Sequence, residues 1–484
     1  MDYAASFYLT AAEIGLSVAG LVLLLVTAWT TEKAARGITI AAVAALFGAL
    51  FFNLSLYGEG VAGDAFSGLI RVDNFAIFAK SLIYIATITC LIVAPRYFTP
   101  RNQYRGEYAV LMLFNAVGMG LMVSAVDLMT LYVGLELSSL SSYVLASFAR
   151  RDDKSSEAGL KYFVLGGLAS GIILYGVSLL YGFSGTTSYD GIRAAFSVEF
   201  STGALFGVVF VLAGMAFKIA AVPFHMWTPD VYEGAPTPVT AFFASAPKVA
   251  AVAMLVRMAT GPFGGQVDAW QQIVIFAALA SIVVGALGAI GQQNLKRLLA
   301  YSSINNVGFI LIGLAAATPQ GIEGVLIYLS IYVFMTIGSF VALLMLRDAD
   351  GKALATFDDI SGLSSSSPAL AWCLLALMFS LAGIPPLMGF YGKLVVFQAT
   401  VEAGMLPLAV IGIAASVIGA FYYIKFVKVM FFDEPKGPPP ATAPVSHRVL
   451  LGLSVLAISP LGYLLTPWLE AVARAAAQAL FLSA

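Results

Sequence analysis

Four charged side chains stand inside long apolar stretches of the chain, where a charge requires a reason. They are Glu136, Lys218, Lys393 and Lys248, which directly follows Pro247. A charge at the centre of a bilayer costs about 2.5–3.5 kcal/mol on insertion scales. Carboxyl and amine groups in such places can exchange protons, because burial disfavours the charged form and a nearby opposite charge favours it. We therefore interpret these four residues as candidates for proton transfer.

The expected chemistry depends on the distance between the acid and the first lysine. At about 4 Å and an effective dielectric constant near 20, a carboxylate attracts an ammonium group by about 4 kcal/mol. This attraction is large enough to decide whether a desolvated lysine is neutral or protonated at pH 7. Movement of Glu136 toward or away from Lys218 would therefore load or discharge Lys248. Static buried ion pairs and snorkelling side chains are the alternative interpretations.

Two further residues are candidates for the same pathway. Lys161 lies near the inner end of the apolar segment 159–183, where snorkelling and proton transfer are both possible roles. His225 follows Pro223, one to two turns beyond Lys218, and the proline break favours a functional histidine there. The remaining charges near apolar segments are expected to have structural roles: snorkelling for Lys80, Lys425 and Lys428, helix packing for Glu13, interfacial positions for Asp127 and Arg257, and turn or capping contacts for Asp230 and Glu233.

The composition places these residues in a membrane protein. Of 484 residues, 60% are hydrophobic and only 11% are charged, whereas a soluble domain carries about 25% charged residues. A net charge of −1 gives no basic excess that would indicate nucleic-acid binding. The two cysteines and two histidines are too few for an iron–sulfur cluster or haem ligated in the usual ways, so electron transfer would have to occur on other subunits. Clustered carboxylates for sodium are also missing from the apolar segments, which favours protons.

Fourteen apolar segments are long enough to cross a bilayer, which takes about 20 residues. We expect membrane helices at 9–29, 37–58, 74–94, 107–126, 127–149, 159–183, 203–227, 237–259, 270–291, 296–317, 322–346, 369–399, 407–431 and 447–466. The first contains Glu13 and follows no basic region, so it is not expected to be a cleaved signal. The segment 369–399 contains two prolines, Pro385 and Pro386, and is expected to be a broken helix.

The distribution of lysine and arginine predicts the orientation. If the N-terminus lies outside, the inner loops hold fourteen basic residues, and the outer loops and tail hold only Arg71, Arg193 and Arg474. Positive residues concentrate on the cytoplasmic side of membrane proteins. Both termini are therefore expected to face outward, which agrees with an even number of helices.

Scattered identities at an offset of 169 residues indicate an internal repeat. For example, Leu212-Ala213-Gly214 recurs as Leu381-Ala382-Gly383. The repeat unit is then five helices, and because five is odd, the second copy enters the membrane from the opposite face. Inverted repeats with broken helices are typical of transporters. We expect a three-helix segment at 1–106, two inverted five-helix repeats at 107–260 and 261–432, and a C-terminal helix at 433–484.

Three stretches resemble the antiporter-like membrane subunits of proton-pumping NADH:quinone oxidoreductase, respiratory complex I. They are GLELSSL at 134–140, WTPDVYEGAP at 227–236 and GIPPLMGFYGK at 383–393. Within that family the chain is most similar to the subunit N branch, because subunit M typically has glutamate where Lys393 stands and subunit L has a long C-terminal extension. The resemblance covers nearly the whole chain.

The resemblance implies roles for the candidate residues and for the surroundings of the chain. Glu136 and Lys218 match the modulating pair, Lys161 and Lys248 the inner relay, and Lys393 the outward exit. No cofactor is expected in this chain, and FMN, iron–sulfur clusters and quinone are expected on partner subunits. The implied partners are subunit M, the small membrane subunits and the lipid bilayer, in a bacterial inner membrane.

Three functions are compatible with a fold of this kind. The first is a proton-translocating, non-redox subunit of NADH:quinone oxidoreductase. The second is a subunit of a multisubunit cation/proton antiporter, and the third is a membrane scaffold without transport. The stretch 227–236 and Lys393 favour the first over the second, and the buried lysines argue against the third.

Overall fold

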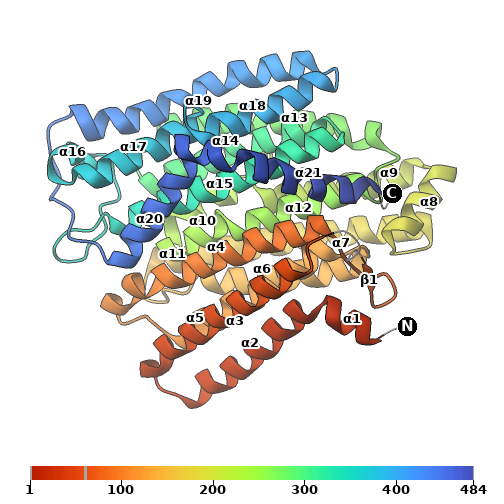
Figure 1. Cartoon of the computed structure of the whole chain (residues 1–484), viewed down its shortest axis with the longest axis horizontal. Helices are drawn as coiled ribbons and strands as arrows, with labels where there is room; N and C mark the ends of the chain where they lie inside the picture. The colour runs from red at the N-terminus through yellow and green to blue at the C-terminus, as the bar shows by residue number, and fades with distance from the viewer. Residues whose placement is uncertain (1–2, 59–62, 483–484) are drawn as a thin grey trace.

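The computed structural model describes residues 3–58 and 63–482, and within them the chain is an α-helical bundle (Figure 1). Twelve helical segments of the described part are long and apolar enough to cross a membrane. They are formed by α2 (Ala11–Trp29), α3 (Ala35–Ser55), α4 (Asn74–Phe98), α5 (Gly106–Ser124), α6 (Leu128–Ala146), α7 (Asp153–Ser184), α9 (Thr202–Ile219), α11 (Thr237–Phe243) with α12 (Ala246–Thr260), α13 (Val267–Ile290), α14 (Leu295–Ala315), α15 (Pro319–Met345) and α19 (Leu406–Phe432). The expected all-α polytopic membrane fold is confirmed.

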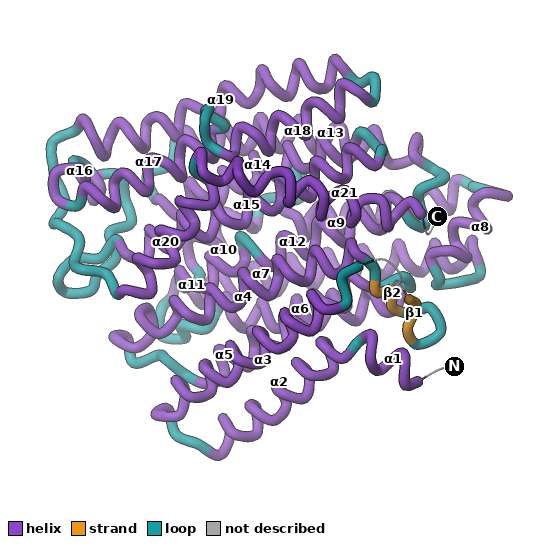
Figure 2. The backbone as a smooth tube through the Cα atoms, in the orientation of Figure 1, coloured by secondary structure: helices purple, strands orange, loops and turns teal. Residues whose placement is uncertain are grey.

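Shorter elements complete and connect the bundle. The helices are α1 (Tyr3–Leu9), α8 (Tyr189–Val198), α10 (Trp227–Gly234), α16 (Leu363–Ser366), α17 (Pro368–Ala382), α18 (Met388–Glu402), α20 (Val445–Ile458) and α21 (Thr466–Leu482). Strands β1 (Gly63–Ala65) and β2 (Ile70–Val72) form a small antiparallel hairpin, drawn in orange in Figure 2. In Figure 1 this hairpin, α8 and the labels of both termini lie at one end of the bundle, and α16 lies at the other.

The broken helix expected at 369–399 is present, and a second break was not expected. The helix α17 ends at Ala382, Gly383 has a φ of +85°, and α18 begins at Met388. The segment expected as one helix at 203–227 is interrupted in the same way, because α9 ends at Ile219 and Ala220 takes the left-handed conformation with a φ of +62°. His225 therefore lies in the turn between α9 and α10, and not at the end of a continuous helix.

The C-terminal segment also departs from the expected single helix at 447–466. The helix α20 ends at Ile458, and the chain bends by 66° before it continues through α21 to the end of the described residues. The helix α21 packs against α15 and α4. The last segment thus covers the side of the bundle near its centre and does not add one more straight span.

Paired structural features relate the two halves of the bundle at a different offset from the expected 169. The side chains of Asp127 and Asn294 cap α6 and α14, each by accepting two backbone N–H bonds. The close approaches of Gly118 to α6 and of Gly285 to α14 share this offset of 167. At the two breaks, the left-handed residues Ala220 and Gly383 are 163 residues apart. The spacing between cap and break therefore differs between the two halves, so no single offset aligns both landmarks.

The corrected alignment changes which residues correspond in the two halves. Counted from the caps, Glu136 corresponds to Ser303, whereas an offset of 169 would pair it with Asn305. Counted from the breaks, Lys218 corresponds to Leu381, whereas an offset of 169 would pair it with Leu387. The second half therefore has a hydroxyl in place of the acid and an apolar residue in place of the lysine.

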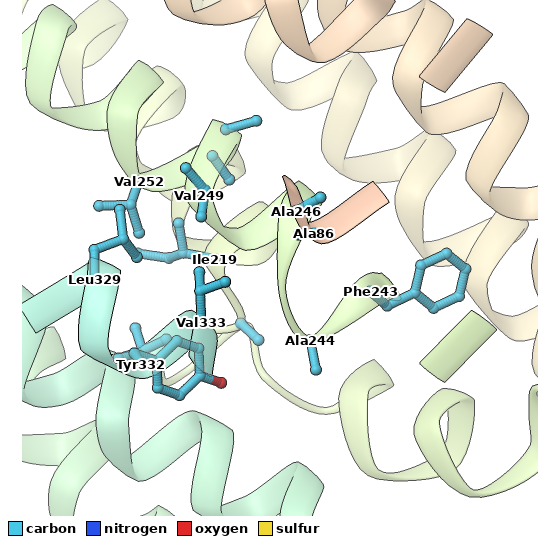
Figure 3. Close-up of a cluster of buried hydrophobic side chains, with 14 of the residues drawn as sticks. Ala86, Ile219, Phe243, Ala244, Ala246, Val249, Val252, Leu329, Tyr332 and Val333 are labelled. Carbon is cyan, nitrogen blue, oxygen red and sulfur yellow. The ribbon is translucent and has the colours of Figure 1, made fainter. Parts of the chain in front are cut away.

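The centre of the bundle consists of α12, α14 and α15, which are almost completely enclosed, whereas α2 and α7 present a face outward. Figure 3 shows buried side chains that gather there, among them Ile219 of α9, Val249 of α12 and Leu329 of α15. Ile219 and Val249 are the chain neighbours of Lys218 and Lys248. Close apolar packing of this kind leaves little space for bulk water beside the two lysines.

Candidate proton-transfer site

Lys248 lies in the first turn of α12, in the middle of the bundle, and is 2% exposed. Its Nζ donates a hydrogen bond of 2.6 Å to Ser303 Oγ of α14. The same hydroxyl shares a hydrogen bond of 2.8 Å with the Tyr332 hydroxyl of α15. The interruption between α11 and α12, at residues 244–245, places Lys248 at a helix start in the centre of the molecule. Hydroxyl groups, and not a carboxylate, thus hold this lysine.

Lys218 lies near the end of α9 and faces α6 and α7. Its Nζ donates to Ser139 Oγ at 2.7 Å and lies 3.5 Å from both the Tyr143 hydroxyl and Ser170 Oγ. The expected partner Glu136 lies on the same helix as Ser139, and its Oε1 is buried without a hydrogen-bond partner. The two residues share one region, but the structure shows no direct ion pair between them.

Lys393 extends from α18 back to the break in front of that helix and is 8% exposed. Its Nζ donates to the Ala382 carbonyl at 2.9 Å and to Ser416 Oγ at 3.2 Å, and it lies 4.3 Å from the centroid of the Phe309 ring. The last carbonyls of a helix have no partner within the helix. The break at Gly383 therefore supplies the acceptor that holds Lys393.

Two other buried cations are paired with acids, which the sequence did not indicate. Lys80 forms a salt bridge with Glu13, and both side chains are buried. The Arg257 guanidinium donates to both carboxylate oxygens of Asp73 at 2.9 and 2.7 Å. The expected snorkelling of Lys80 is therefore wrong, and Arg257, in the last turn of α12, is buried against Asp73.

By contrast, the three central lysines have no such partner. Among the residues that the structure describes, no carboxylate oxygen lies within 4.0 Å of the Nζ atoms of Lys218, Lys248 and Lys393. A nearby carboxylate stabilises the protonated amine, and a hydroxyl does so much less. These three lysines are consequently better able to release a proton than Lys80, which is paired with Glu13.

Lys161 lies in an ion-pair network at the end of the bundle and is partly exposed. Its Nζ is 2.7 Å from Glu157 and 2.7 Å from Asp230 of α10. Asp230 also accepts from the Arg297 guanidinium at 2.6 Å, and Glu233 pairs with Lys154 at 3.2 Å and with Arg297 at 3.4 Å. A cavity of about 220 Å³ lies among these residues. Asp230 and Glu233 are thus centres of the network, and the loop or capping roles expected for them are wrong.

His225 stands apart from the lysines in its contacts. It lies half-buried in the turn after Pro223, and its Nδ1 has no hydrogen-bond partner. Neither His225 nor Lys161 has a hydrogen bond to Lys218 in the described part of the chain. The structure therefore brings Glu136, Lys218 and the hydroxyls of α6 and α7 into one region, with Lys161 and His225 outside it.

A chain of uncharged polar groups in the second half was not expected. The Tyr328 hydroxyl donates to Asn306 Oδ1 at 2.6 Å, and Asn306 Nδ2 lies 3.4 Å from both Ser302 Oγ and the Tyr423 hydroxyl. Ser302 is the chain neighbour of Ser303, which holds Lys248. The cluster SSINN at 302–306, inside an otherwise apolar helix, was the signal that could have revealed these residues.

The positions expected to be peripheral are less informative for the site. Lys428 is largely exposed and contacts Asp433 after the end of α19, as a snorkelling side chain would. Lys425 lies over the Phe357 ring at 5.0 Å.

Within residues 3–58 and 63–482, no three histidine, cysteine, aspartate or glutamate residues are grouped so that they could hold a metal ion.

The chain is similar in sequence to known membrane proteins. The family described as NADH:quinone oxidoreductase/Mrp antiporter, TM, matches residues 125–419. The NADH-quinone oxidoreductase subunit N of Erythrobacter litoralis is 63% identical over 486 residues and covers 100% of both chains. The subunit N of Rhizorhabdus wittichii is 58% identical over 99% of this chain and 100% of the relative.

Solved structures agree with these sequence relatives. A chain of respiratory complex I from Thermus thermophilus with bound Aureothin matches with a TM-score of 0.82 and 31% identity, over 96% of this chain and 99% of that chain. A chain of the Mrp complex from Dietzia sp. DQ12-45-1b matches with a TM-score of 0.84 over 99% and 98% of the two chains, and at 23% identity this likeness shows the shared fold alone. The resemblance read from the three sequence stretches is confirmed, and the chain belongs to the NADH:quinone oxidoreductase/Mrp antiporter transmembrane family, on its subunit N branch.

Proposed function

We propose that the chain is a proton-translocating membrane-arm subunit of a bacterial NADH:quinone oxidoreductase and takes no part in electron transfer itself. In this proposal FMN, iron–sulfur clusters and quinone are held by other subunits, and quinone reduction there drives protons through this chain. The neighbours are subunit M and the small membrane subunits, in the bacterial inner membrane. Relatives named subunit N, which are 63% and 58% identical over 100% and 99% of this chain, support the assignment.

The observation that carries the proposal is the contrast between the two kinds of buried cation. Lys80 and Arg257 are neutralised by Glu13 and Asp73, as expected of structural charges. Lys218, Lys248 and Lys393 are held by hydroxyl and carbonyl oxygens. A scaffold without transport has no need of three amines whose positive charge is not compensated inside an apolar bundle.

The proposed pathway runs from the basic end of the bundle to the end that carries both termini. The Lys161–Asp230 network forms the inner mouth, and Glu136 sets the charge of Lys218. Lys248 is the central carrier, and Lys393, at the broken helix, is the exit. The Ser302–Asn306 hydroxyl and amide groups lie along the second half and offer proton donors and acceptors between these lysines.

The proposal is tested by replacing Lys248 with another residue in the intact complex. Lys248→Ala removes the amine, and Lys248→Arg keeps the positive charge but does not release a proton at neutral pH. We expect both variants to lower proton translocation per NADH several-fold in inside-out membrane vesicles, with the complex still assembled. Proton uptake and NADH:quinone turnover are measured on the same vesicles, so that the ratio can be compared with wild type.

The matched control is Lys428→Arg, the same exchange at an exposed lysine at the end of α19. This variant should pump as wild type does. Normal proton translocation by an assembled Lys248→Arg complex would show that Lys248 is a structural cation, and the proposed role of this chain would then have to be abandoned.

A further inference from the structure

A cavity of about 610 Å³ lies between α3, α4 and the start of α20, away from the lysine pathway. Its volume falls within the range of about 300–1,000 Å³ that is typical of ligand pockets. One part of the wall is polar and contains Arg36, Arg96 and His447. Farther along α3 and α4 the wall is apolar, with Ile40 and Leu91 among its residues. The cavity thus joins a cationic end to an apolar groove.

The two arginines of this wall have no acid to neutralise them. Among the described residues, no carboxylate oxygen lies within 4.0 Å of the guanidinium groups of Arg36 and Arg96. Arg105 shows the contrast, because it pairs with Glu32 at 2.9 Å. Arg36 stands in the first turn of α3, where the partial positive charge of a helix N-terminus adds to its own. The cationic end of the cavity therefore lacks a counter-charge from the described chain.

More positive charge lies directly behind this wall. The guanidinium groups of Arg101 and Arg347 lie 4.2 and 4.9 Å from the centroid of the same Tyr97 ring. Burial, together with the positive charges of Arg101 and Arg96, lowers the pKa of Arg347 to about 10. Arg347 still carries its charge at neutral pH, so Arg101 and Arg347 add positive charge to that of Arg36 and Arg96.

His447 provides an independent indication of a missing ligand. It is 1% exposed, lines the cavity, and its Nε2 has no hydrogen-bond partner. Its Nδ1 lies 3.3 Å from Ser446 Oγ. Buried polar groups are satisfied in the great majority of cases, by protein, water or a ligand. A hydrogen-bonding group from outside the chain would give His447 Nε2 a partner.

We propose that the cavity is a binding site for an anionic diacyl phospholipid. The phosphate group lies between Arg36 and Arg96, with His447 as a further contact, and one acyl chain follows the apolar wall of α3 and α4. Arginines bind phosphate oxygens through paired N–H groups. Basic pockets between membrane helices on the cytoplasmic side are suited to such head groups.

The shape of the wall favours a lipid over a free anion. The lining residues of α3 extend from Arg36 to Val43, a distance of seven residue steps or about 10 Å at 1.5 Å per residue. A free phosphate would use only the arginine end and would leave this apolar surface uncovered. The charged group at the helix ends and the apolar groove along the helices match the two parts of one lipid molecule.

The test uses the purified membrane assembly that contains the full chain and a phosphatidylglycerol with a photoreactive diazirine in its acyl chain. We expect cross-links in peptides that contain residues 36–43 and 91–96. Unlabelled phosphatidylglycerol should compete, and phosphatidylcholine and inorganic phosphate should not. Equal competition by inorganic phosphate would indicate a site for a free anion, and absence of cross-links would indicate that another subunit covers the cavity; either result overturns the proposal.

Variants decide whether the arginines are responsible. Each basic residue near a membrane surface contributes about fivefold in affinity for anionic lipid, so Arg36→Gln with Arg96→Gln should weaken labelling about 30-fold. The control is Arg150→Gln with Arg151→Gln, which removes the same charge from two exposed residues of the α6–α7 loop and should label as wild type.

A third variant covers the case in which the double exchange prevents assembly. Ile40→Trp fills the apolar groove and leaves both arginines in place, and it should abolish labelling without a change in NADH:quinone turnover. Unchanged labelling in Ile40→Trp, or equal losses in the 36/96 and 150/151 variants, would refute the site.

Discussion

At the scale of single residues, the buried charges divide into two kinds. Some form structural ion pairs that hold two helices together, and others are groups that can change their charge. The pair Lys80–Glu13 joins α4 to α2, and the pair Arg257–Asp73 joins α12 to the cap of α4. Removing one partner of a buried pair costs about 3–5 kcal/mol, because the other charge is left uncompensated, whereas replacing both by apolar groups is often nearly neutral. The stability of single and double variants therefore distinguishes a structural ion pair from a proton carrier.

The pair Lys80–Glu13 gives a prediction for the stability of the assembly. Glu13→Gln should destabilise the chain by about 3–5 kcal/mol and lower the temperature at which the purified complex loses this subunit. Glu13→Gln combined with Lys80→Met should recover most of that loss, because no charge remains in the interior. The dissociation temperature is followed on native gels, and proton translocation per NADH is measured on the fraction that stays assembled.

If the Lys80–Glu13 pair has a structural role only, the single and the double variant should both translocate as many protons per NADH as wild type. A double variant that is as unstable as the single one would show that the pair is not a structural ion pair between α2 and α4. A double variant that is stable but fails to pump would place Glu13 and Lys80 in the proton pathway instead.

The sequence allowed the three central lysines to be predicted, and it did not allow their partners to be predicted. A charge within an apolar stretch is visible without a structure, which is why Lys218, Lys248 and Lys393 could be named. Glu13 and Lys80 contact each other only because α2 packs near α4, and no local sequence pattern predicts that contact. Hydroxyl side chains carry no formal charge and are common in membrane helices, so the polar groups around Ser303 do not stand out in the sequence.

At the scale of elements, the break between α17 and α18 positions the side chain of Lys393. At the break after α17, Gly383 adopts a φ of +85°, and a Cβ at that position would lie 2.9 Å from Lys393 Cδ. The glycine therefore serves two purposes, because it permits the left-handed turn and leaves room for the lysine. At the break after α9, Ala220 takes the left-handed conformation despite its Cβ.

Gly383→Ala should therefore impair proton translocation. The left-handed conformation costs a residue with a Cβ about 1–2 kcal/mol, and the added methyl group also displaces Lys393 from the Ala382 carbonyl. We expect proton translocation per NADH to fall several-fold, while the amount of assembled complex changes little. The measurement is the same vesicle assay of proton uptake and NADH:quinone turnover.

Gly404→Ala provides the matched control for this prediction. Gly404 has a φ of +78°, and a Cβ added there would meet no heavy atom within 4 Å. This exchange introduces the same backbone strain without touching a lysine, and it should leave the proton ratio unchanged. If both glycine variants lost proton translocation equally, backbone strain and not the position of Lys393 would be responsible.

The two breaks differed in how readily they could be predicted. The sequence Gly383-Ile384-Pro385-Pro386 combines a residue suited to the left-handed turn with two prolines inside an apolar run, and both signals indicate a break. In the first half the left-handed residue is Ala220 and only Pro223 interrupts the helix pattern, so this break was mistaken for a helix end. The short helix α10 and its acidic residues were misplaced as a consequence.

At the scale of the whole molecule, the segments long and apolar enough to cross a membrane followed from the sequence. Hydrophobic length decides which segments cross a bilayer, and this property does not depend on tertiary contacts. Each of the fourteen expected segments corresponds to a helix or a broken helix in the described residues. The bend between α20 and α21 depends on packing against α15 and α4, and it could not be read from hydrophobicity.

The orientation of the bundle leads to the last prediction. Val198 is the last residue of α8 and is 88% exposed. The helix α8 lies at the end of the bundle with both termini (Figure 1). Asp350 is exposed in the loop after α15, among the basic loops. In a Cys373→Ser background, a membrane-impermeant maleimide should label Val198→Cys in right-side-out vesicles and Asp350→Cys only in inside-out ones. The buried Cys90 should stay unlabelled in both. The opposite pattern would reverse the orientation, and Lys393 would then open toward the cytoplasm, which contradicts its role as the outward exit.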